Sequence, residues 1–359
     1  MSLNGFWKSA LGAAALAMAC GAQAAPKGIA VTVEPEKHAL GQDEDAVVRV
    51  TLTNTSDQPQ YVLKWRTPFE GVDAPLFEVS RDGERVPYTG PLAKRGAPKQ
   101  SDYFLLKPGA SHTVKVELSA LYDMSVTGDY QISYKTQSPD LFWNASTPEA
   151  REMRSEPATL WVDGRLPRGA TPPTLDLEAM KRGTDPAPSA GGLSFARCTT
   201  SQQSTIVQAM QAGLNMASDS DAYMSKPSLG ARYTKWFGAA DSGRAAKVKA
   251  NFAAIKDAFA NKPVTVDCGC KKTYYAYVYP TQPYTIYVCK AFWSAPLTGT
   301  DSKGGTLLHE MSHFNVVAGT DDYAYGQSAA ANLAITDPAK AVDNADSHEY
   351  FGENTPALQ

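Results

Sequence analysis

One stretch, residues 306–326, constrains the fold and the chemistry of this chain more than any other. It reads TLLHEMSHFNVVAGTDDYAYG, is apolar at helical spacing, and carries His309, Glu310 and His313 before it breaks at a glycine. Positions i and i+4 lie on the same face of a helix, so the two imidazoles can bind one metal ion. Glu310 follows the first histidine directly and lies near that ion without being a ligand. This spacing is typical of a zinc site with two histidine ligands and a carboxylate general base.

A pattern this short also arises by chance on an amphipathic helix with a solvated His-Glu-x-x-His face. Several other positions of the run argue against a solvated face, because they are apolar: Leu307, Leu308, Met311 and Phe314. The chain has five histidines, and two of them fall at this spacing. The sequence therefore favours a buried metal site.

The third ligand decides the subclass, because catalytic zinc usually has three protein ligands and one open position. The metzincin pattern requires a Gly and then a His after the second histidine, but Val316 and Gly319 stand there, which excludes that subclass. A thermolysin-like enzyme would take a glutamate from a later helix, either Glu349 or Glu353. Nearer candidates are the two carboxylates just past the glycine: Asp321 and Asp322.

Residues 319–326 read GTDDYAYG and fit the pattern GTxDxxYG. With this segment after His-Glu-x-x-His, the sequence resembles the aspzincins, the deuterolysin and peptidyl-Lys metalloendopeptidase group. The resemblance implies three ligands for one catalytic Zn²⁺ ion: His309, His313 and Asp322. It also implies that Glu310 is the general base and that the Tyr325 phenol hydrogen-bonds the oxyanion of the tetrahedral intermediate. Asp321 falls on the variable position, and without the resemblance Tyr325 would be interpreted as a packed core residue.

Two further carboxylates, Asp346 and Glu349, are three positions apart and share a helix face. Spacing alone is as typical of a solvated acidic face, although two carboxylates beside a zinc site also suit a lysine ammonium. In the Lys-specific branch of the family a near-identical segment supplies the acidic S1′ pocket. The resemblance therefore implies protein or peptide substrates with lysine at P1′, cut on its amino side. His348, between the two carboxylates, is interpreted as structural.

The first 24 residues have the pattern of a secretory signal peptide. Lys8 precedes a short apolar run over 10–20, and Ala22-Gln23-Ala24 is a cleavage site. The run is too short to span a bilayer. Cys20 raises a lipoprotein alternative, but the Ala-Met-Ala before it is a poor lipobox. We predict export through a cleaved signal peptide, and hence a secreted, extracellular protein.

Export makes the cysteine count informative. Beyond Cys20 four remain, and an even count in an oxidising compartment predicts two disulfides. Of the three pairings, one that joins Cys268 to Cys270 is disfavoured, because i and i+2 in a strand lack disulfide geometry. A second metal site on this Cys-x-Cys is the functional alternative. The resemblance implies the pairs Cys198–Cys268 and Cys270–Cys289.

The segment from about 30 to 162 is predicted to be β-rich. Short alternating or β-branched runs recur between turn signals, at 29–33, 47–52, 61–65, 76–79, 112–118, 130–134 and 159–162. Such a series with no convincing helix predicts an Ig-like antiparallel β-sandwich. It carries no cluster of catalytic residue types, and His38 and His112 stand alone.

Residues 164–192 are rich in Pro, Gly and Ala and have no apolar period, so they are predicted to be an exposed linker open to proteolysis. The chain then divides into a signal peptide (1–24), a prodomain (25–163), the linker with its processing site (164–192) and a metalloendopeptidase domain (193–359). The prodomain would inhibit by covering the cleft, since no cysteine is present for a cysteine switch between the signal and Cys198. Lys181 is a candidate for self-processing.

The C-terminal part is predicted to be an α+β zincin-type domain. Apolar residues at helical spacing indicate core helices at 201–217 and 242–259. Aromatic and β-branched runs at 264–268, 274–279 and 285–289 indicate a small sheet, and the region 284–288 is a candidate for the edge strand that pairs with an extended substrate.

Charge and composition exclude some partners. The formal net charge is −3 with no basic patch, which gives no reason to expect nucleic acid, and no later segment resembles a membrane span.

Three alternatives to a Lys-specific endopeptidase stay open. They are a deuterolysin-like enzyme of broader specificity, a gluzincin-type protease with Glu349 as third ligand, and an exported, non-enzymatic binding protein with a structural metal.

Overall fold

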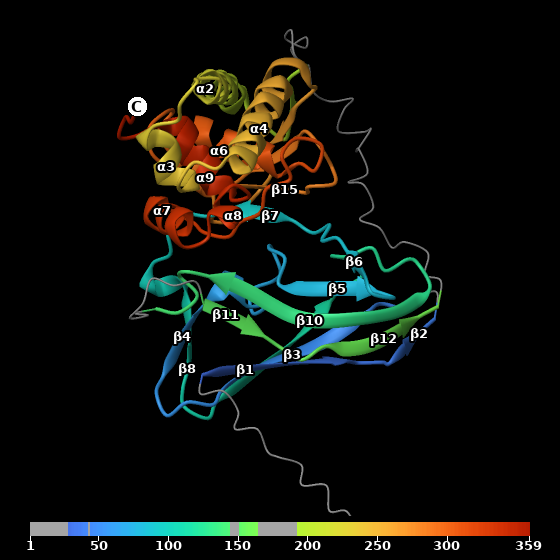
Figure 1. The fold of residues 1–359 in the computed structure, drawn as a ribbon. Coiled ribbons are helices and arrows are strands. Elements are labelled where there is room, and N and C mark those ends of the chain that lie inside the picture. The colour runs from blue at the N-terminus through green and yellow to red at the C-terminus, as the bar shows by residue number, and fades with distance from the viewer. Residues whose placement is uncertain (1–27, 42–43, 144–150, 164–191) are drawn as a thin grey trace, which may run out of the picture.

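The computed structural model describes residues 28–41, 44–143, 151–163 and 192–359. The predicted signal peptide and the linker with Lys181 lie outside the described residues. The described part forms an N-terminal β half and a C-terminal half rich in helices, each around its own apolar core (Figure 1).

The N-terminal half contains two sheets and a two-stranded ribbon. The first sheet has the order β1-β3-β9, the second β2-β12-β10-β5-β6 with β11 paired to β10, and the ribbon is β4-β8. The strand bounds are β1 (Ile29–Pro35), β2 (Ala39–Leu40), β3 (Val47–Asn54), β4 (Gln60–Leu63), β5 (Phe77–Arg81), β6 (Glu84–Val86), β8 (Tyr103–Leu106), β9 (Ser111–Glu117), β10 (Gly128–Ser138), β11 (Arg151–Arg154) and β12 (Ala158–Val162).

All pairs in this half are antiparallel except β2–β12. Alternate residues of β3 and β10 are buried, as the period of a strand with one face on a core requires. Each of the seven predicted strands is confirmed, while the immunoglobulin-like topology stays a prediction. Two 3₁₀ turns, Lys64–Arg66 and Gln100–Asp102, lie at the same end of the ribbon, where Leu63 pairs with Tyr103.

The C-terminal half has a five-stranded sheet of order β13-β14-β16-β15-β7. Its strands are β13 (Ser194–Ala196), β14 (Thr265–Asp267), β15 (Ala276–Val278), β16 (Thr285–Val288) and, from the N-terminal half, β7 (Leu92–Lys94). The first three in spatial order are parallel, and β15 and β7 continue antiparallel. The prediction of a substrate-binding edge at 284–288 is wrong, because β16 lies between β14 and β15. The outer strands of the catalytic half are β13 at one edge and β15 at the edge that β7 joins.

The helices of this half are α2 (Thr200–Met224), α3 (Ala231–Phe237), α4 (Ser242–Asn261), α5 (Lys290–Ser294), α6 (Lys303–His313), α7 (Gln327–Thr336), α8 (Pro338–Ala341) and α9 (Ala345–Glu353). The two predicted core helices are present as α2 and α4. Helix α2 begins with a capping box, in which the Thr199 hydroxyl accepts from Gln202 N (3.3 Å) and the Gln202 side chain accepts from Thr199 N (2.9 Å).

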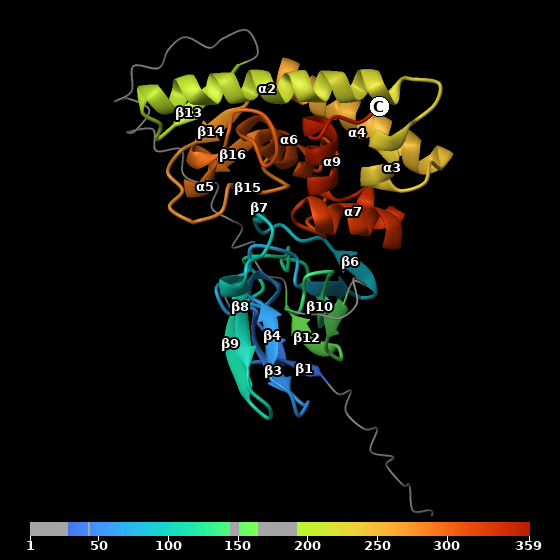
Figure 2. The same ribbon diagram turned by 90° about the vertical axis from the view of Figure 1, so that its left-hand side faces the viewer.

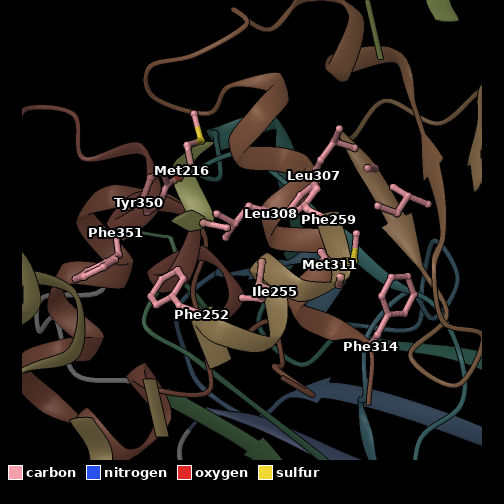
Figure 3. Close-up of a cluster of buried hydrophobic side chains, with 14 of the residues drawn as sticks. Met216, Phe252, Ile255, Phe259, Leu307, Leu308, Met311, Phe314, Tyr350 and Phe351 are labelled. Carbon is pink, nitrogen blue, oxygen red and sulfur yellow. The ribbon is translucent and has the colours of Figure 1, made fainter. Parts of the chain in front are cut away.

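Helix α6 is the centre of the C-terminal core, and every one of its residues is buried. Figure 3 shows the side chains of Leu307, Leu308 and Met311 among those of α2, α4 and α9. The apolar side chains of α6 lie in this core, and its polar side chains are buried as well. The polar side chains of α6 are therefore fixed in position by packing on several sides.

Two disulfides, Cys198–Cys268 and Cys270–Cys289, tie the sheet together, with the pairing that the resemblance implied. In the described part of the chain, no helix combines the length and the apolar character that crossing a membrane requires.

Candidate active site

Helix α6 holds three of the predicted site residues, all of them buried: His309, Glu310 and His313. Its N-terminus is capped by Ser302, whose hydroxyl accepts from Gly305 N (3.0 Å). A Cβ at Gly305 would overlap Glu353 Oε1 and lie 3.0 Å from Glu349 Oε1, so glycine at this position leaves room for the carboxylates of α9. One helical turn separates His309 from His313, and their Nε2 atoms are 3.1 Å apart.

The chain returns to the histidines after α6 ends. Gly319 adopts φ +59°, a left-handed conformation that favours glycine, and the next residue folds back onto the helix. Thr320 N donates to Ser312 O (3.2 Å), and Thr320 O accepts from His313 Nδ1 (2.7 Å). This return places Asp322 Oδ1 3.2 Å from His309 Nε2 and 3.5 Å from His313 Nε2.

The donor set of these three residues fits a zinc ion. Both oxygens of the Asp322 carboxylate are buried, and neither has an oriented hydrogen bond to any described residue. A buried carboxylate in this state is costly unless a cation compensates it. Burial opposes ionisation of Asp322, but the two imidazoles outweigh it and hold the pKa of this carboxyl below its usual range. Two imidazole nitrogens and one carboxylate oxygen that converge are a ligand set that Zn²⁺ accepts.

The outer nitrogens of both histidines also have partners. His309 Nδ1 lies 2.9 Å from Asp346 Oδ1 and 3.3 Å from Glu349 Oε2. These are close charge contacts and not oriented hydrogen bonds, and a carboxylate at this edge of the ring favours a proton on the outer nitrogen of a metal-binding imidazole. Glu349 is thus at the ring edge opposite Nε2, and Glu353 hydrogen-bonds Ser302 N (2.8 Å). The structure brings neither glutamate to the convergence point, which contradicts the gluzincin alternative.

The side chain of Glu310 points from α6 toward the N-terminal half and contacts strand β7 there. Its Oε1 accepts from Lys94 N (3.4 Å), and its Oε2 has no hydrogen-bond partner among the described residues. Burial raises the pKa of the Glu310 carboxyl to about 7, although the neighbouring imidazoles lower it. A carboxyl with a pKa near neutrality can accept and return a proton, as a general base must. The Tyr325 hydroxyl donates to Ala93 O (2.9 Å) nearby.

The acidic pair on α9 lines a closed pocket beside the metal ligands. Lys94 Nζ lies in it, 2.6 Å from Glu349 Oε2 and 3.7 Å from Asp346 Oδ1, and all three side chains are fully buried. A third carboxylate, Asp301, approaches the same ammonium at 3.3 Å. Sequence reasoning missed Asp301, because it stands in a turn before α6 with no motif around it. Its φ of +51° was the kind of backbone feature that only the structure reveals.

Helix α9 is held in place by residues of α3 and α4, away from the acidic pocket. The buried guanidinium of Arg232 on α3 donates from Nε (2.9 Å) and Nη2 (2.6 Å) to Phe351 O. His348 is structural, as predicted. Its Nδ1 contacts Asn344 O (3.0 Å), and its Nε2 contacts the side chain of Asn251 (3.1 Å) on α4. The remaining residue of the loop, Asp321, accepts from the Tyr323 hydroxyl (3.1 Å) and does not reach the histidines.

Comparisons with known proteins agree with this geometry. A family model described as lysine-specific metallo-endopeptidase, of the aspzincins, matches residues 222–353. An extracellular protease of Aeromonas hydrophila is 50% identical over 323 residues, which cover 88% of this chain and 90% of that protein. The peptidyl-Lys metalloendopeptidase of Armillaria mellea is 36% identical over 328 residues, 88% of each chain. That of Pleurotus ostreatus is 44% identical over 168 residues, 46% of this chain and 99% of the relative. The chain therefore belongs to the aspzincin family of zinc metalloendopeptidases.

Proposed function

We propose that this chain is a secreted endopeptidase, made as a zymogen, that hydrolyses peptide bonds on the amino side of lysine. The observation that carries the proposal is the buried acidic pocket beside the metal ligands, in which a lysine ammonium contacts Glu349 at 2.6 Å. Lysine has a compact ammonium that suits a closed pocket of this kind. The peptidyl-Lys relatives support the same specificity.

Each site residue has a role in this proposal. His309, His313 and Asp322 hold one Zn²⁺ ion, which supplies Lewis-acid chemistry at the substrate carbonyl and at a water molecule when it is bound. Glu310 takes a proton from the attacking water and passes it to the leaving amine. The Tyr325 hydroxyl donates a hydrogen bond to the carbonyl oxygen on which charge develops.

The division of the chain is part of the proposal. Residues 1–24 would direct export, 25–163 would form an Ig-like prodomain that covers the cleft, and 193–359 would be the enzyme, with processing in the linker 164–192. The name of the Aeromonas hydrophila relative supports an extracellular location. Contacts between the β half and the site support inhibition: Arg66 donates to Asp322 O and to Tyr323 O (3.2 Å), on the loop that carries the third ligand.

Mapping of cleavage sites tests the proposal. The processed protein is incubated with a denatured protein mixture, with and without a zinc chelator, and the new N-termini are identified by mass spectrometry. New N-termini that are nearly all lysine and disappear with the chelator are the expected result. Chelator-sensitive cutting at mixed residues would instead indicate a broader, deuterolysin-like specificity. A correctly processed, zinc-loaded protein that cuts nothing would favour the non-enzymatic binding protein.

Glu349→Gln is expected to lower kcat/KM for Xaa-Lys peptides about 100-fold, because it removes one partner of a buried charge pair. Steady-state kinetics on matched Lys and Ala peptides measure the change, and cleavage of the Ala peptide should stay within about threefold. Glu349 is a better choice than Asp346, since Asp346 Oδ1 lies closer to His309 Nδ1 and Asp346 Oδ2 accepts from Gly326 N. Equal losses on both peptides would contradict a pocket specific for lysine.

Tyr325→Phe is expected to lower kcat by about 10²-fold with little change in KM, since its hydroxyl serves the developing oxyanion. Stability should change less, because one neutral hydrogen bond is worth about 1 kcal/mol. Kinetics and thermal unfolding of the processed enzyme measure both. Tyr323→Phe is the matched control, since its hydroxyl contacts Asp321 and not the cleft. If Tyr325→Phe kept the kcat of the parent, the proposed role of the Tyr325 hydroxyl in catalysis would be contradicted.

A further inference from the structure

A short segment of the N-terminal half occupies the substrate position of the catalytic half. Strand β7 extends the sheet beyond β15, with Ala276 opposite Lys94 and Tyr277 opposite Ala93 in antiparallel register. Tyr275 N donates to Lys94 O (3.2 Å). Figures 1 and 2 show β7 between the two halves, directly below β15. Addition of an extended strand to a sheet edge is a common way to bind a peptide through its backbone.

The side chain of Lys94 fills the acidic pocket. Its Nζ lies 2.6 Å from Glu349 Oε2 and 3.3 Å from Asp301 Oδ1, with Tyr275 as a ring neighbour at 5.1 Å. Burial alone would lower the pKa of the Lys94 ammonium, but the carboxylates around it, Asp346 first, raise this pKa well above its ordinary value. Lys94 is therefore charged, and it occupies the place that the proposed function gives to a substrate lysine.

Both polar atoms of the Ala93–Lys94 peptide bond are hydrogen-bonded to proposed catalytic groups. Ala93 O accepts from the Tyr325 hydroxyl at 2.9 Å, and Lys94 N donates to Glu310 Oε1 at 3.4 Å. The proposed oxyanion donor thus contacts the carbonyl, and the proposed base contacts the amide nitrogen that would become the leaving amine. A group placed at hydrogen-bond distance from the reacting atoms is the first requirement of general acid–base catalysis.

We propose that Ala93–Lys94 is bound as a substrate in the full chain and is the bond that the zinc-loaded chain hydrolyses first, within its own molecule. The inference rests on the proposed function and names its first substrate. One water molecule is consumed. Its oxygen forms the new bond to the Ala93 carbonyl carbon, the C–N bond breaks, and Glu310 carries a water proton to Lys94 N. The products are a carboxylate on Ala93 and an α-amine on Lys94.

This cut leaves the N-terminal half folded, because strands on both sides of the bond pair with each other. Strand β3 pairs with β9, and β5 pairs with β10. Arg95, which follows the cut, also contacts a residue that precedes it. Its Nη2 lies 3.1 Å from Asp73 Oδ2, and its guanidinium stacks over the Tyr274 ring at 4.7 Å. The cleaved chain is therefore expected to remain one particle under native conditions and to separate into fragments only when it is denatured.

The test uses the full chain, purified with a chelator and then loaded with Zn²⁺ alone. Denaturing mass spectrometry follows the fragment pair that ends at Ala93 and begins at Lys94, and native size exclusion follows the particle. The expected result is that this pair appears before any other Xaa-Lys cut, while the native elution volume stays the same. Because both partners are in one molecule, its first-order rate should be independent of the chain concentration.

Matched variants separate this site from other lysines. Lys94→Gln should slow cleavage at this bond about 100-fold, because the pocket loses its buried charge partner. Lys107→Gln, at an exposed lysine of the same half, should leave the rate unchanged.

A second readout needs no turnover. In the full-length Glu310→Gln variant, an amine-acetylating ester should modify Lys107 rapidly and Lys94 at least 100-fold more slowly, because Lys94 is fully buried. Denaturation should make the two rates similar. This result is expected whether or not zinc is present.

Three results would overturn the inference and leave the proposed function standing. The first is an intact Ala93–Lys94 bond in a zinc-loaded chain whose processed form cuts Xaa-Lys peptides. The second is a rate that rises with chain concentration, and the third is rapid acetylation of Lys94 in the folded variant. A different result would be that Lys94 is protected from acetylation but neither this bond nor any Xaa-Lys peptide is cut. The proposed function would then be wrong, and the proposed cleavage with it.

Discussion

Glu310→Gln is expected to give a folded protein that binds zinc and has a kcat about 10³-fold below that of the parent, the upper range for loss of a positioned base being 10⁴. The amide has the shape of the carboxyl but cannot take a proton from water. The side chain is fully buried on α6, and its Oε2 has no hydrogen-bond partner within the described ranges, so the substitution breaks no oriented contact of that atom. Single-turnover kinetics on an Xaa-Lys peptide, with zinc content by mass spectrometry, measure the result.

The control for this substitution is Asp257→Asn, which removes an exposed carboxylate from α4 of the same half. It should leave both kcat and zinc content unchanged. If Glu310→Gln retains more than about a tenth of the parental kcat, Glu310 is not the base, given the contribution expected of one. Loss of zinc from this variant would instead show that Glu310 supports the ligands.

Asp322→Ala is expected to abolish stable zinc binding and, with it, turnover on any peptide. Its carboxylate is the third member of the convergent set, at 3.2 Å from His309 Nε2, and two imidazoles alone form an incomplete zinc site. The measurement is zinc per chain after dialysis against a weak chelator, followed by a zinc titration. We expect the apparent affinity to fall by more than about 100-fold, the upper range reported for loss of an outer-shell partner.

Asp321→Ala is the matched control, since this neighbour contacts the Tyr323 hydroxyl and not the histidines. It should retain one zinc ion per chain. If Asp322→Ala retained zinc as well, another carboxylate would have to be the third ligand. Glu349 would then be the first candidate, against the position that it has in the structure at His309 Nδ1.

The parts of the site that depend on one helix could be predicted from the sequence. The period of an α-helix alone brings His309 and His313 to one face, and it does the same for Asp346 and Glu349. The same local rules gave α2 and α4, whose apolar stripes are long enough to be unambiguous. The third ligand needed more than periodicity. Its position depends on the turn at Gly319 and on a backbone return to α6, so the family pattern was needed to choose Asp322.

The parts that depend on contacts between distant segments could not be predicted. Strand β7 is three residues, too short to show a period, and Lys94 looks like any other lysine in the sequence. The edge strand was assigned wrongly because β15 and β16 are both aromatic and β-branched, and this composition does not distinguish an inner strand from an outer one. Asp301 was missed for a similar reason, since its carboxylate joins the pocket only when α9 packs beside α6.

On the proposed function, the position of Lys94 would make maturation an exchange of one counterion for another. In the full chain one internal ammonium neutralises carboxylates that are closed off from water. If the N-terminal half is released as the proposed function requires, that charge would leave with it, and Asp346 and Glu349 would lose their ammonium partner. Like charges buried without a cation are destabilising, so the enzyme gains stability from any alkylammonium group that enters. On the proposed function, free lysine and primary-amine buffer components would therefore compete with substrates, and the released enzyme would be least stable while no ammonium occupies the pocket.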